Sequence, residues 1–212
     1  MLFRSGAEHA LYVRTLDESL ELKRRLDAAV SVAVIGGGFI GLEVAAAARM
    51  LGKAATVIEA QPRLMARVVA PVVSQFFFDQ HTARGVRVML NAFVERLEAG
   101  AVILRDGTRV EAELIVAGIG VLPNDELARE AGLATGNGIA VDEYLRTSDP
   151  KLFAIGDCAE YPSIYADKRV RLESVQNAVD QATSVAKAIC GKPEPYTAVP
   201  WFWSTQFDIH MQ

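Results

Sequence analysis

Residues 32–43 read Val32-Ala-Val-Ile-Gly-Gly-Gly-Phe-Ile-Gly-Leu-Glu43, an apolar run that leads through a cluster of glycines into an alanine-rich segment. The pattern predicts a buried strand, a tight turn and a helix. Gly36 allows the turn, Gly38 lets backbone N–H groups approach a ligand, and Gly41 lets the helix lie close to the strand. A glycine motif of this spacing, between a strand and a helix, is typical of a site for the pyrophosphate of a dinucleotide.

A second strand supports this interpretation. It reads Ala55-Thr-Val-Ile-Glu59 and ends in an acid placed to accept hydrogen bonds from both ribose hydroxyls of an adenosine. A carboxylate repels the 2′-phosphate of NADP, so the sequence favours NAD unless Arg63 reaches the same spot. The alternatives are a structural glycine turn and a solvated acid at a strand end. The predicted cofactor site comprises Gly36, Gly37, Gly38, Phe39, Ile40, Gly41, Glu59 and Arg63.

The composition excludes several other classes of protein. The chain has 212 residues, 51% of them hydrophobic, which suffices for one large domain or two smaller ones. The formal net charge of −4 is spread in short mixed runs, so no basic face indicates nucleic acid or a membrane surface. The longest uncharged apolar run, 28–42, is too short to span a bilayer. Because no signal-peptide pattern opens the chain, we expect a cytoplasmic protein.

The cysteines and histidines predict no metal site. Cys158 and Cys190 lie far apart and form no CxxC motif, and the three histidines are scattered. Both cysteines are interpreted as small buried hydrophobic residues. Any redox chemistry must then come from organic cofactors.

Several further elements surround the glycine motif in the first part of the chain. Thr15-Leu-Asp-Glu18 is a capping box that opens a helix to about Ala29. A second helix starts at Pro71, and we expect it to cover the sheet with Val72, Val73, Phe76 and Phe77. The last elements are a strand at 86–90, an antiparallel meander over 94–110 with Asp106-Gly107 as a two-residue turn, and a buried strand at 114–118.

A second unit is expected after Asn124. It comprises short strands, including 152–155, and a helix that begins near Val175. Trp201 and Trp203 are interpreted as core residues of an edge strand, with electron transfer as the alternative. The helix carries an apolar stripe made of Val175, Ala178, Val179, Ala182, Val185, Ala186 and Ile189.

Four motifs together resemble one family. They are Gly36-Gly-Gly-Phe-Ile-Gly41-Leu-Glu43, Gly118-Ile-Gly-Val-Leu-Pro-Asn124, Phe153-Ala-Ile-Gly-Asp157-Cys-Ala and Leu172-Glu-Ser-Val-Gln-Asn177-Ala. In this order and spacing they resemble the pyridine nucleotide-disulfide oxidoreductase superfamily, and within it the ferredoxin/rubredoxin reductase branch related to apoptosis-inducing factor. Pro200-Trp-Phe-Trp-Ser204 resembles the opening of that branch's C-terminal domain, although Thr205 stands where the branch more often has an acid.

The resemblance implies an activity and a domain plan. Proteins of this branch are flavoenzymes in which NADH reduces FAD, and FAD reduces a small iron–sulfur protein such as a ferredoxin or rubredoxin. The family carries a second GxGxxG motif for FAD near its N-terminus, and this chain has only one, so it is similar to a fragment. The expected parts are the end of a first FAD-domain segment (1–16), an NAD(H)-binding domain (17–124), a second FAD-domain segment (125–192) and the start of a C-terminal interface domain (193–212).

The expected fold is therefore α/β, with a Rossmann-like three-layer NAD-binding domain, in which a meander covers a parallel sheet, and a partial FAD-binding domain. The resemblance places Glu43 near the nicotinamide carboxamide as the catalytic carboxylate, although a first-turn acid is also favoured by the helix dipole alone. It places Gly118, Ile119 and Gly120 under the nicotinamide ribose. It places the FAD at Gly156, Asp157, Glu173, Ser174 and Val175.

Two other functions stay open. The isolated chain is also interpreted as an NAD(H)-binding module without turnover, because it lacks half of the FAD site. A weaker alternative is an NADH oxidase or peroxidase, which is disfavoured because no redox-active cysteine is placed to face a flavin.

Overall fold

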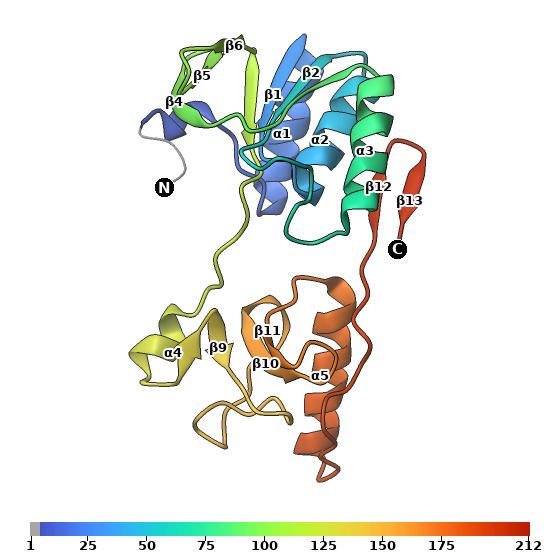
Figure 1. Cartoon of the computed structure of the whole chain (residues 1–212). Coiled ribbons are helices and arrows are strands. Elements are labelled where there is room, and N and C mark those ends of the chain that lie inside the picture. Colours follow the sequence, from blue (N-terminus) through green and yellow to red (C-terminus); the bar gives the residue numbers. More distant parts are fainter. Residues whose placement is uncertain (1–4) are drawn as a thin grey trace. The chain divides into compact units, whose positions relative to one another are not determined.

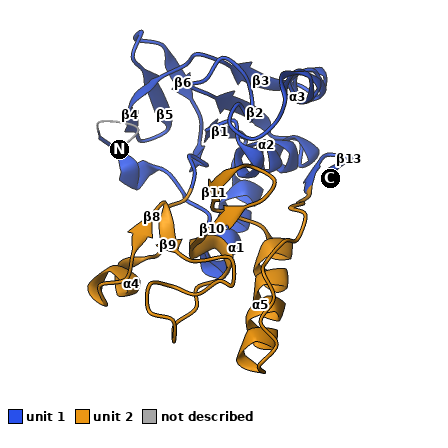
Figure 2. Ribbon diagram, turned by 60° about the horizontal axis from the view of Figure 1, so that its bottom comes forward, with its two compact units in different colours: residues 1–120, 204–211 blue, residues 121–203, 212 orange. Residues whose placement is uncertain are grey.

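The computed structural model describes residues 5–212 and divides the chain into two compact units. Unit 1 comprises residues 1–120 and 204–211, and unit 2 comprises 121–203 and 212 (Figure 2). Residues 1–4 lie outside the described residues. They are the first residues of the range 1–16 that the resemblance assigns to a first FAD-domain segment.

Unit 1 is built on a parallel sheet with the strand order β3-β2-β1-β7. Figure 1 labels its strands β1 and β2. Its strands are β1 (Ser31–Ile35), β2 (Ala54–Ile58), β3 (Val86–Met89) and β7 (Leu114–Ala117). The helices that pack on it are α1 (Leu16–Ala28), α2 (Phe39–Met50) and α3 (Pro71–Ala83), and a short 3-10 turn, η1 (Ala7–His9), precedes them. The predicted capping box is confirmed, since the Thr15 side chain accepts a hydrogen bond from Glu18 N and the Glu18 carboxylate accepts one from Thr15 N.

Alternate residues of β1 face the two layers that cover the sheet. Val32 and Val34 pack in the cluster formed with the helices, whereas Ala33 and Ile35 pack in a second cluster with the meander. The meander consists of β4 (Val94–Glu98), β5 (Ala101–Leu104) and β6 (Arg109–Glu111), paired antiparallel. The predicted three-layer, Rossmann-like arrangement is thus confirmed in unit 1.

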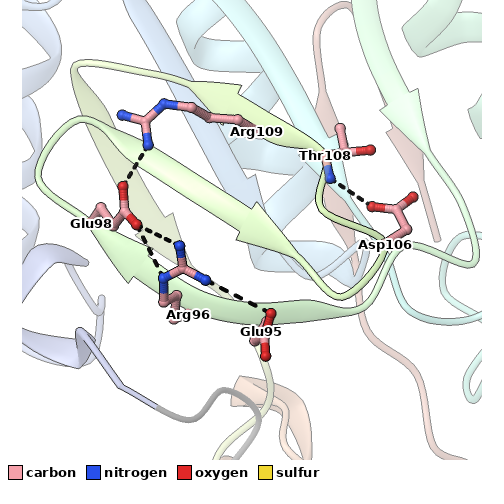
Figure 3. Close-up of polar contacts among 6 residues, drawn as sticks. All are labelled: Glu95, Arg96, Glu98, Asp106, Thr108 and Arg109. Atoms are coloured by element: carbon pink, nitrogen blue, oxygen red, sulfur yellow. Dashed lines mark hydrogen bonds and ion pairs between the residues drawn. The ribbon is translucent and has the colours of Figure 1, made fainter.

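The meander turn differs in one detail from the prediction. Leu104 N donates to Thr108 O, so the loop holds three residues and not two, and Gly107 takes φ 86° at its end. Asp106 favours this geometry because its carboxylate accepts a hydrogen bond from Thr108 N at 2.9 Å (Figure 3). The same view shows Glu98 between Arg96 and Arg109, an exposed ion-pair group that leaves the buried face of the meander apolar.

Helix α3 buries only part of the predicted face: Phe77 is buried and Val73 packs against the helix-side core. Val72 and Phe76 are 75% and 46% exposed, whereas Phe77 is buried together with the polar Ser74 and His81. The reason is that both polar side chains have partners: Ser74 Oγ donates to Leu64 O at 2.6 Å, and His81 Nε2 lies 2.8 Å from Gln206 Oε1.

Gln206 belongs to a hairpin that packs on α2 and α3, far from it in sequence. The hairpin consists of β12 (Ser204–Gln206) and β13 (Ile209–Met211), and its residues Phe207, Ile209 and Met211 join the helix-side core. Residues assigned by sequence to the start of another domain therefore pack within unit 1.

Unit 2 contains a small sheet with the strand order β11-β10-β9-β8. Its elements are α4 (Glu126–Glu130), β8 (Thr135–Gly136), β9 (Gly138–Ala140), η2 (Gly156–Cys158), β10 (Ala159–Ser163), β11 (Lys168–Val170) and α5 (Val175–Ile189). The predicted strand at 152–155 is wrong, because only Phe153 forms a β-bridge there, with Arg146.

The apolar stripe on α5 is largely exposed. Val175, Val179 and Ile189 are 63%, 57% and 70% exposed, while Gln176, Asn177 and Gln181 are buried. The buried amides have partners within unit 2: Gln181 Oε1 accepts from Gly156 N at 2.7 Å, and Asn177 Oδ1 accepts from Tyr196 OH at 3.2 Å. The apolar face of α5 is thus left without a covering layer.

The interpretation of the two tryptophans as strand core residues is also wrong. Trp201 and Trp203 lie outside any strand, and they are 45% and 51% exposed, with ring centroids 5.5 Å apart.

His81 makes the stability of unit 1 depend on pH. Burial lowers the pKa of His81 below its ordinary value of 6.5, against a smaller opposing effect of the Gln206 hydrogen bond. In the unfolded chain this imidazole binds a proton near pH 6.5, while in the folded unit it stays neutral to lower pH. We therefore expect the free energy of unfolding to be level above about pH 7 and to fall as the pH drops below 6.5.

Urea unfolding at pH 7.5 and 5.5 measures this effect. Part of the loss at pH 5.5 is expected to disappear in His81→Gln, which keeps an N–H donor for Gln206 but does not titrate. An identical pH dependence in the two proteins would contradict the assignment.

Candidate dinucleotide-binding site

The turn between β1 and α2 can be built only with glycine at two positions. Gly36 has φ 104°, and a Cβ there would lie 2.3 Å from Gly118 O. A Cβ on Gly41 would lie 2.1 Å from Gly36 O and 3.2 Å from Val34 Cγ1. The predicted tight turn and the close approach of helix to strand are therefore confirmed.

Gly38 presents the opposite situation. It is the N-cap of α2. Within residues 5–212 no side chain caps the helix there, and no atom lies within 4 Å of the position of a Cβ. The first N–H groups of an α-helix have no partner within the helix, and the helix dipole makes this end attractive to an anion. The open space beside Gly38 at the start of α2, where Phe39 and Ile40 form the first turn, is what a pyrophosphate requires.

Glu59 follows β2 and is held beside the turn. Its Oε2 accepts a hydrogen bond from Gly37 N at 2.6 Å, and its Oε1 accepts one from Gln61 N at 2.7 Å. It is therefore a fixed carboxylate and not a freely solvated acid. Each carboxylate oxygen accepts more than one hydrogen bond, so both retain capacity for the hydroxyls of a ribose.

Arg63 is engaged in the loop after Glu59. Its guanidinium donates to Val69 O at 2.9 Å and to Ala66 O at 2.6 Å. These bonds hold the loop. They also engage the guanidinium that could otherwise bind a 2′-phosphate, which supports the preference for NAD.

The segment after β7 lies against the glycine turn. Gly118 N donates to Ile35 O at 2.8 Å, and a Cβ on Gly118 would be 3.2 Å from Gly41 N. Gly120, after Ile119, has φ 100°, and Arg67 Nη2 is 3.6 Å from the position of its Cβ. Sequence reasoning missed Arg67, an exposed cation beside this segment that suits a phosphate. The signal available was its place in the loop that follows Glu59.

Glu43 is the fifth residue of α2, so the expectation of a first-turn acid is wrong. It is half-buried and has a partner far along the chain. Ser204 Oγ donates to Glu43 Oε1 at 2.6 Å, and Gln206 Nε2 donates to Ser204 Oγ at 3.1 Å. Sequence reasoning missed Ser204 and Gln206, because no local pattern connects the hairpin to α2.

The candidate FAD residues belong to unit 2. Gly156 has φ 73° and donates its N–H to the buried Gln181, whose Nε2 has no hydrogen-bond partner. Within residues 5–212 no hydrogen bond or ion pair engages the Asp157 carboxylate, while Ser174 caps α5 by accepting from Asn177 N at 3.2 Å. Glu173, before this cap, pairs with Arg171 at 2.8 Å, and Val175 opens the helix. An uncommitted carboxylate and an unpaired buried amide near a glycine with positive φ fit a polar ligand such as the FAD ribityl chain.

The chain is similar in sequence and structure to known reductases. The pyridine nucleotide-disulphide oxidoreductase family matches residues 3–182. Rhodocoxin reductase of Rhodococcus erythropolis is 48% identical over 206 residues, which cover 95% of this chain and 48% of the relative. Rubredoxin-NAD(+) reductase of Pseudomonas putida is 44% identical, over 91% of this chain and 51% of the relative. The crystal structure of a covalent putidaredoxin reductase–putidaredoxin complex matches with 43% identity and a TM-score of 0.92, over 96% of this chain and 51% of the matched chain.

The parallel sheet, the helix-side core and the glycine turn define a Rossmann-like protein. The chain belongs to the pyridine nucleotide-disulphide oxidoreductase family. The family inferred from the four motifs is therefore confirmed, and the relatives include reductases of the predicted branch. The chain spans about half the length of the curated relatives it matches.

No helix in residues 5–212 is long and apolar enough to cross a membrane. In the same part of the chain, no three His, Cys, Asp or Glu residues lie together in a way that would hold a metal ion.

Proposed function

We propose that this chain provides the NADH site and one segment of the FAD site of a flavoprotein reductase that passes electrons from NADH through FAD to a small iron–sulfur protein of the ferredoxin or rubredoxin type. The observation that carries the proposal is the turn at Gly36–Gly41, open in front of α2 and bordered by the fixed carboxylate of Glu59. The names of the relatives support the choice of acceptor, since they include a rubredoxin reductase and a reductase joined to putidaredoxin.

In this proposal each end of NADH has its own residues. Glu59 binds the adenosine ribose, the N-terminus of α2 at Gly38 binds the pyrophosphate, and Gly118–Gly120 with Glu43 binds the nicotinamide end. FAD supplies the hydride acceptor when bound. Gly156, Asp157 and the segment 173–175 that leads into α5 hold and orient it. The proposed domain ranges are those that the family resemblance implies.

The exposed face of α5 supports the proposal that a further layer completes unit 2. Apolar residues at helical spacing normally pack against another element, and here Val175, Val179 and Ile189 are more than half exposed. The same face supports the second candidate function, an NAD(H)-binding module without turnover. If the layer that covers this face belongs to the FAD site, the site in this chain has only one segment and holds FAD weakly.

The cysteines do not favour an NADH oxidase or peroxidase. Burial raises the pKa of the Cys158 thiol, which donates to Ile155 O at 3.4 Å, so it is not an activated thiolate. Cys190 is exposed beyond the end of α5, so its interpretation as a buried hydrophobic residue is wrong. Both thiols are free, which agrees with the cytoplasmic location that we propose.

The visible absorption spectrum tests the function. The purified chain is incubated with FAD, desalted, and measured without oxygen before and after NADH is added. Flavin absorbance that is retained and then bleached would show that the FAD site forms and accepts hydride in this chain. A colourless protein that still binds NADH would support the binding module. A protein that retains no FAD and binds no NADH would contradict both.

A further inference from the structure

We propose that the β12–β13 hairpin positions Glu43 for the nicotinamide end of NADH, with Ser204 holding the carboxylate and Gln206 and His81 holding Ser204. The inference rests on the proposed function, because it requires Glu43 to lie beside the nicotinamide. It adds three positioning residues, Ser204, Gln206 and His81.

A continuous row of hydrogen bonds connects these side chains within unit 1. Ser204 Oγ lies 2.6 Å from Glu43 Oε1, Gln206 Nε2 lies 3.1 Å from Ser204 Oγ, and His81 Nε2 lies 2.8 Å from Gln206 Oε1. Ser204, Gln206 and His81 are at most 1% exposed. The row therefore runs from a buried imidazole on α3, through the hairpin, to a half-buried carboxylate on α2.

Chemistry fixes the direction of every bond in the row. An ionised carboxylate only accepts, so the single hydroxyl hydrogen of Ser204 must point to Glu43. Ser204 then accepts from the amide NH₂ of Gln206, and the amide oxygen accepts from His81 Nε2–H. Among the described residues His81 Nδ1 has no partner, which fits a neutral imidazole carrying its hydrogen on Nε2.

The hairpin is anchored beyond this row. The Phe207 ring packs edge-on against His81 at 5.1 Å, the Arg84 guanidinium lies 5.1 Å from the same ring, and Arg84 pairs with Asp208 at 2.7 Å. These contacts fix the hairpin to α3, so Ser204 is held by more than its own bonds.

A held carboxylate has a consequence for binding. A glutamate side chain loses rotamer freedom when it contacts a ligand, and that cost falls if the side chain is already fixed. Ser204 occupies Oε1, and no described residue bonds to Oε2 of Glu43, so one oxygen remains for a carboxamide N–H. The hairpin should thus act on the nicotinamide end alone and leave the adenosine end, at Glu59, unaffected.

Calorimetry with NADH and with ADP-ribose, which lacks the nicotinamide, separates the two ends. For the 212-residue chain, Ser204→Ala is expected to weaken NADH binding about 5- to 10-fold and to change ADP-ribose binding less than about twofold. Thr205→Ala is the matched control, because Thr205 is the next residue of β12, is exposed and bonds to His210 instead. Ser204→Thr, which keeps the hydroxyl, is expected to retain NADH affinity.

A double variant shows whether Ser204 acts through Glu43. In a Glu43→Ala background, Ser204→Ala is expected to have no further effect on NADH binding. A full Ser204 effect in that background would overturn the positioning role. A second result would also overturn it: Ser204→Ala binds NADH as tightly as Thr205→Ala, while Glu43→Ala binds NADH weakly. That result leaves the proposed function intact.

Two other results are informative. If Glu43→Ala binds NADH as the parent does, the nicotinamide role of Glu43 fails and the positioning role fails with it. If Ser204→Ala also loses ADP-ribose binding, the substitution has disturbed the packing of unit 1. The test is then repeated with Ser204→Cys, which is nearly isosteric with serine and has only a weak S–H donor. A Ser204→Cys variant that shows no NADH-selective loss would overturn the proposal.

Discussion

Replacing Gly41 with alanine is expected to abolish detectable NADH binding and to destabilise unit 1 by about 1–3 kcal/mol, the usual cost of overpacking. The added Cβ would lie 2.1 Å from Gly36 O, a backbone atom that moves only if the turn moves. Displacing the turn separates the N-terminus of α2 from Glu59, so both binding and stability are lost.

Gly38→Ala is the matched variant for this prediction. Gly38 has φ −82°, and a Cβ there meets no atom within 4 Å, so the fold should tolerate the change. The methyl group instead fills the space assigned to the pyrophosphate, and we expect NADH affinity to fall at least about 10-fold with unchanged urea unfolding. Binding calorimetry and urea unfolding on both variants check this. Normal NADH binding by Gly38→Ala would show that the turn has a structural role only.

Glu59→Gln is expected to remove most of the preference for NADH over NADPH. The amide has one acceptor oxygen, so it keeps the hydrogen bond from either Gly37 N or Gln61 N and loses the other. It also loses the charge that repels a 2′-phosphate and one acceptor for the ribose. We expect the ratio of NADPH to NADH dissociation constants to fall about 10-fold.

The control for this variant is Glu111→Gln, an exposed acid at the end of β6 in the meander. It changes the net charge equally without altering the turn. A selectivity that is the same in Glu59→Gln as in the parent chain would remove Glu59 from the ribose site.

Local patterns predicted the part of the fold that they encode. The alternation of Val32 and Val34 with Ala33 and Ile35 lies within one strand whose two faces are both buried, and the glycines at Gly36 and Gly41 report backbone contacts a few residues away. For this reason the sheet, the meander and the turn were predictable. The roles of the site residues stay predictions, because ligand binding is the measurement that tests them.

Patterns misled where the partner of a face lies elsewhere in the chain. The stripe on α5 is apolar at helical spacing, and periodicity cannot show that buried amides on the opposite side bond to Gly156 and Tyr196. The buried His81 on α3 could not be predicted either, since its partner Gln206 is 125 residues away. The row that ends at Glu43 is therefore visible only in the folded chain.

Calorimetric titration of NADH and NADPH into the 212-residue chain tests the central claim most directly. The account predicts saturable binding of one NADH per chain, weaker binding of NADPH, and loss of both in Gly41→Ala. The absence of saturable NADH binding by a folded chain, or equal binding by the parent chain and Gly41→Ala, would contradict the assignment of this turn as the NADH site.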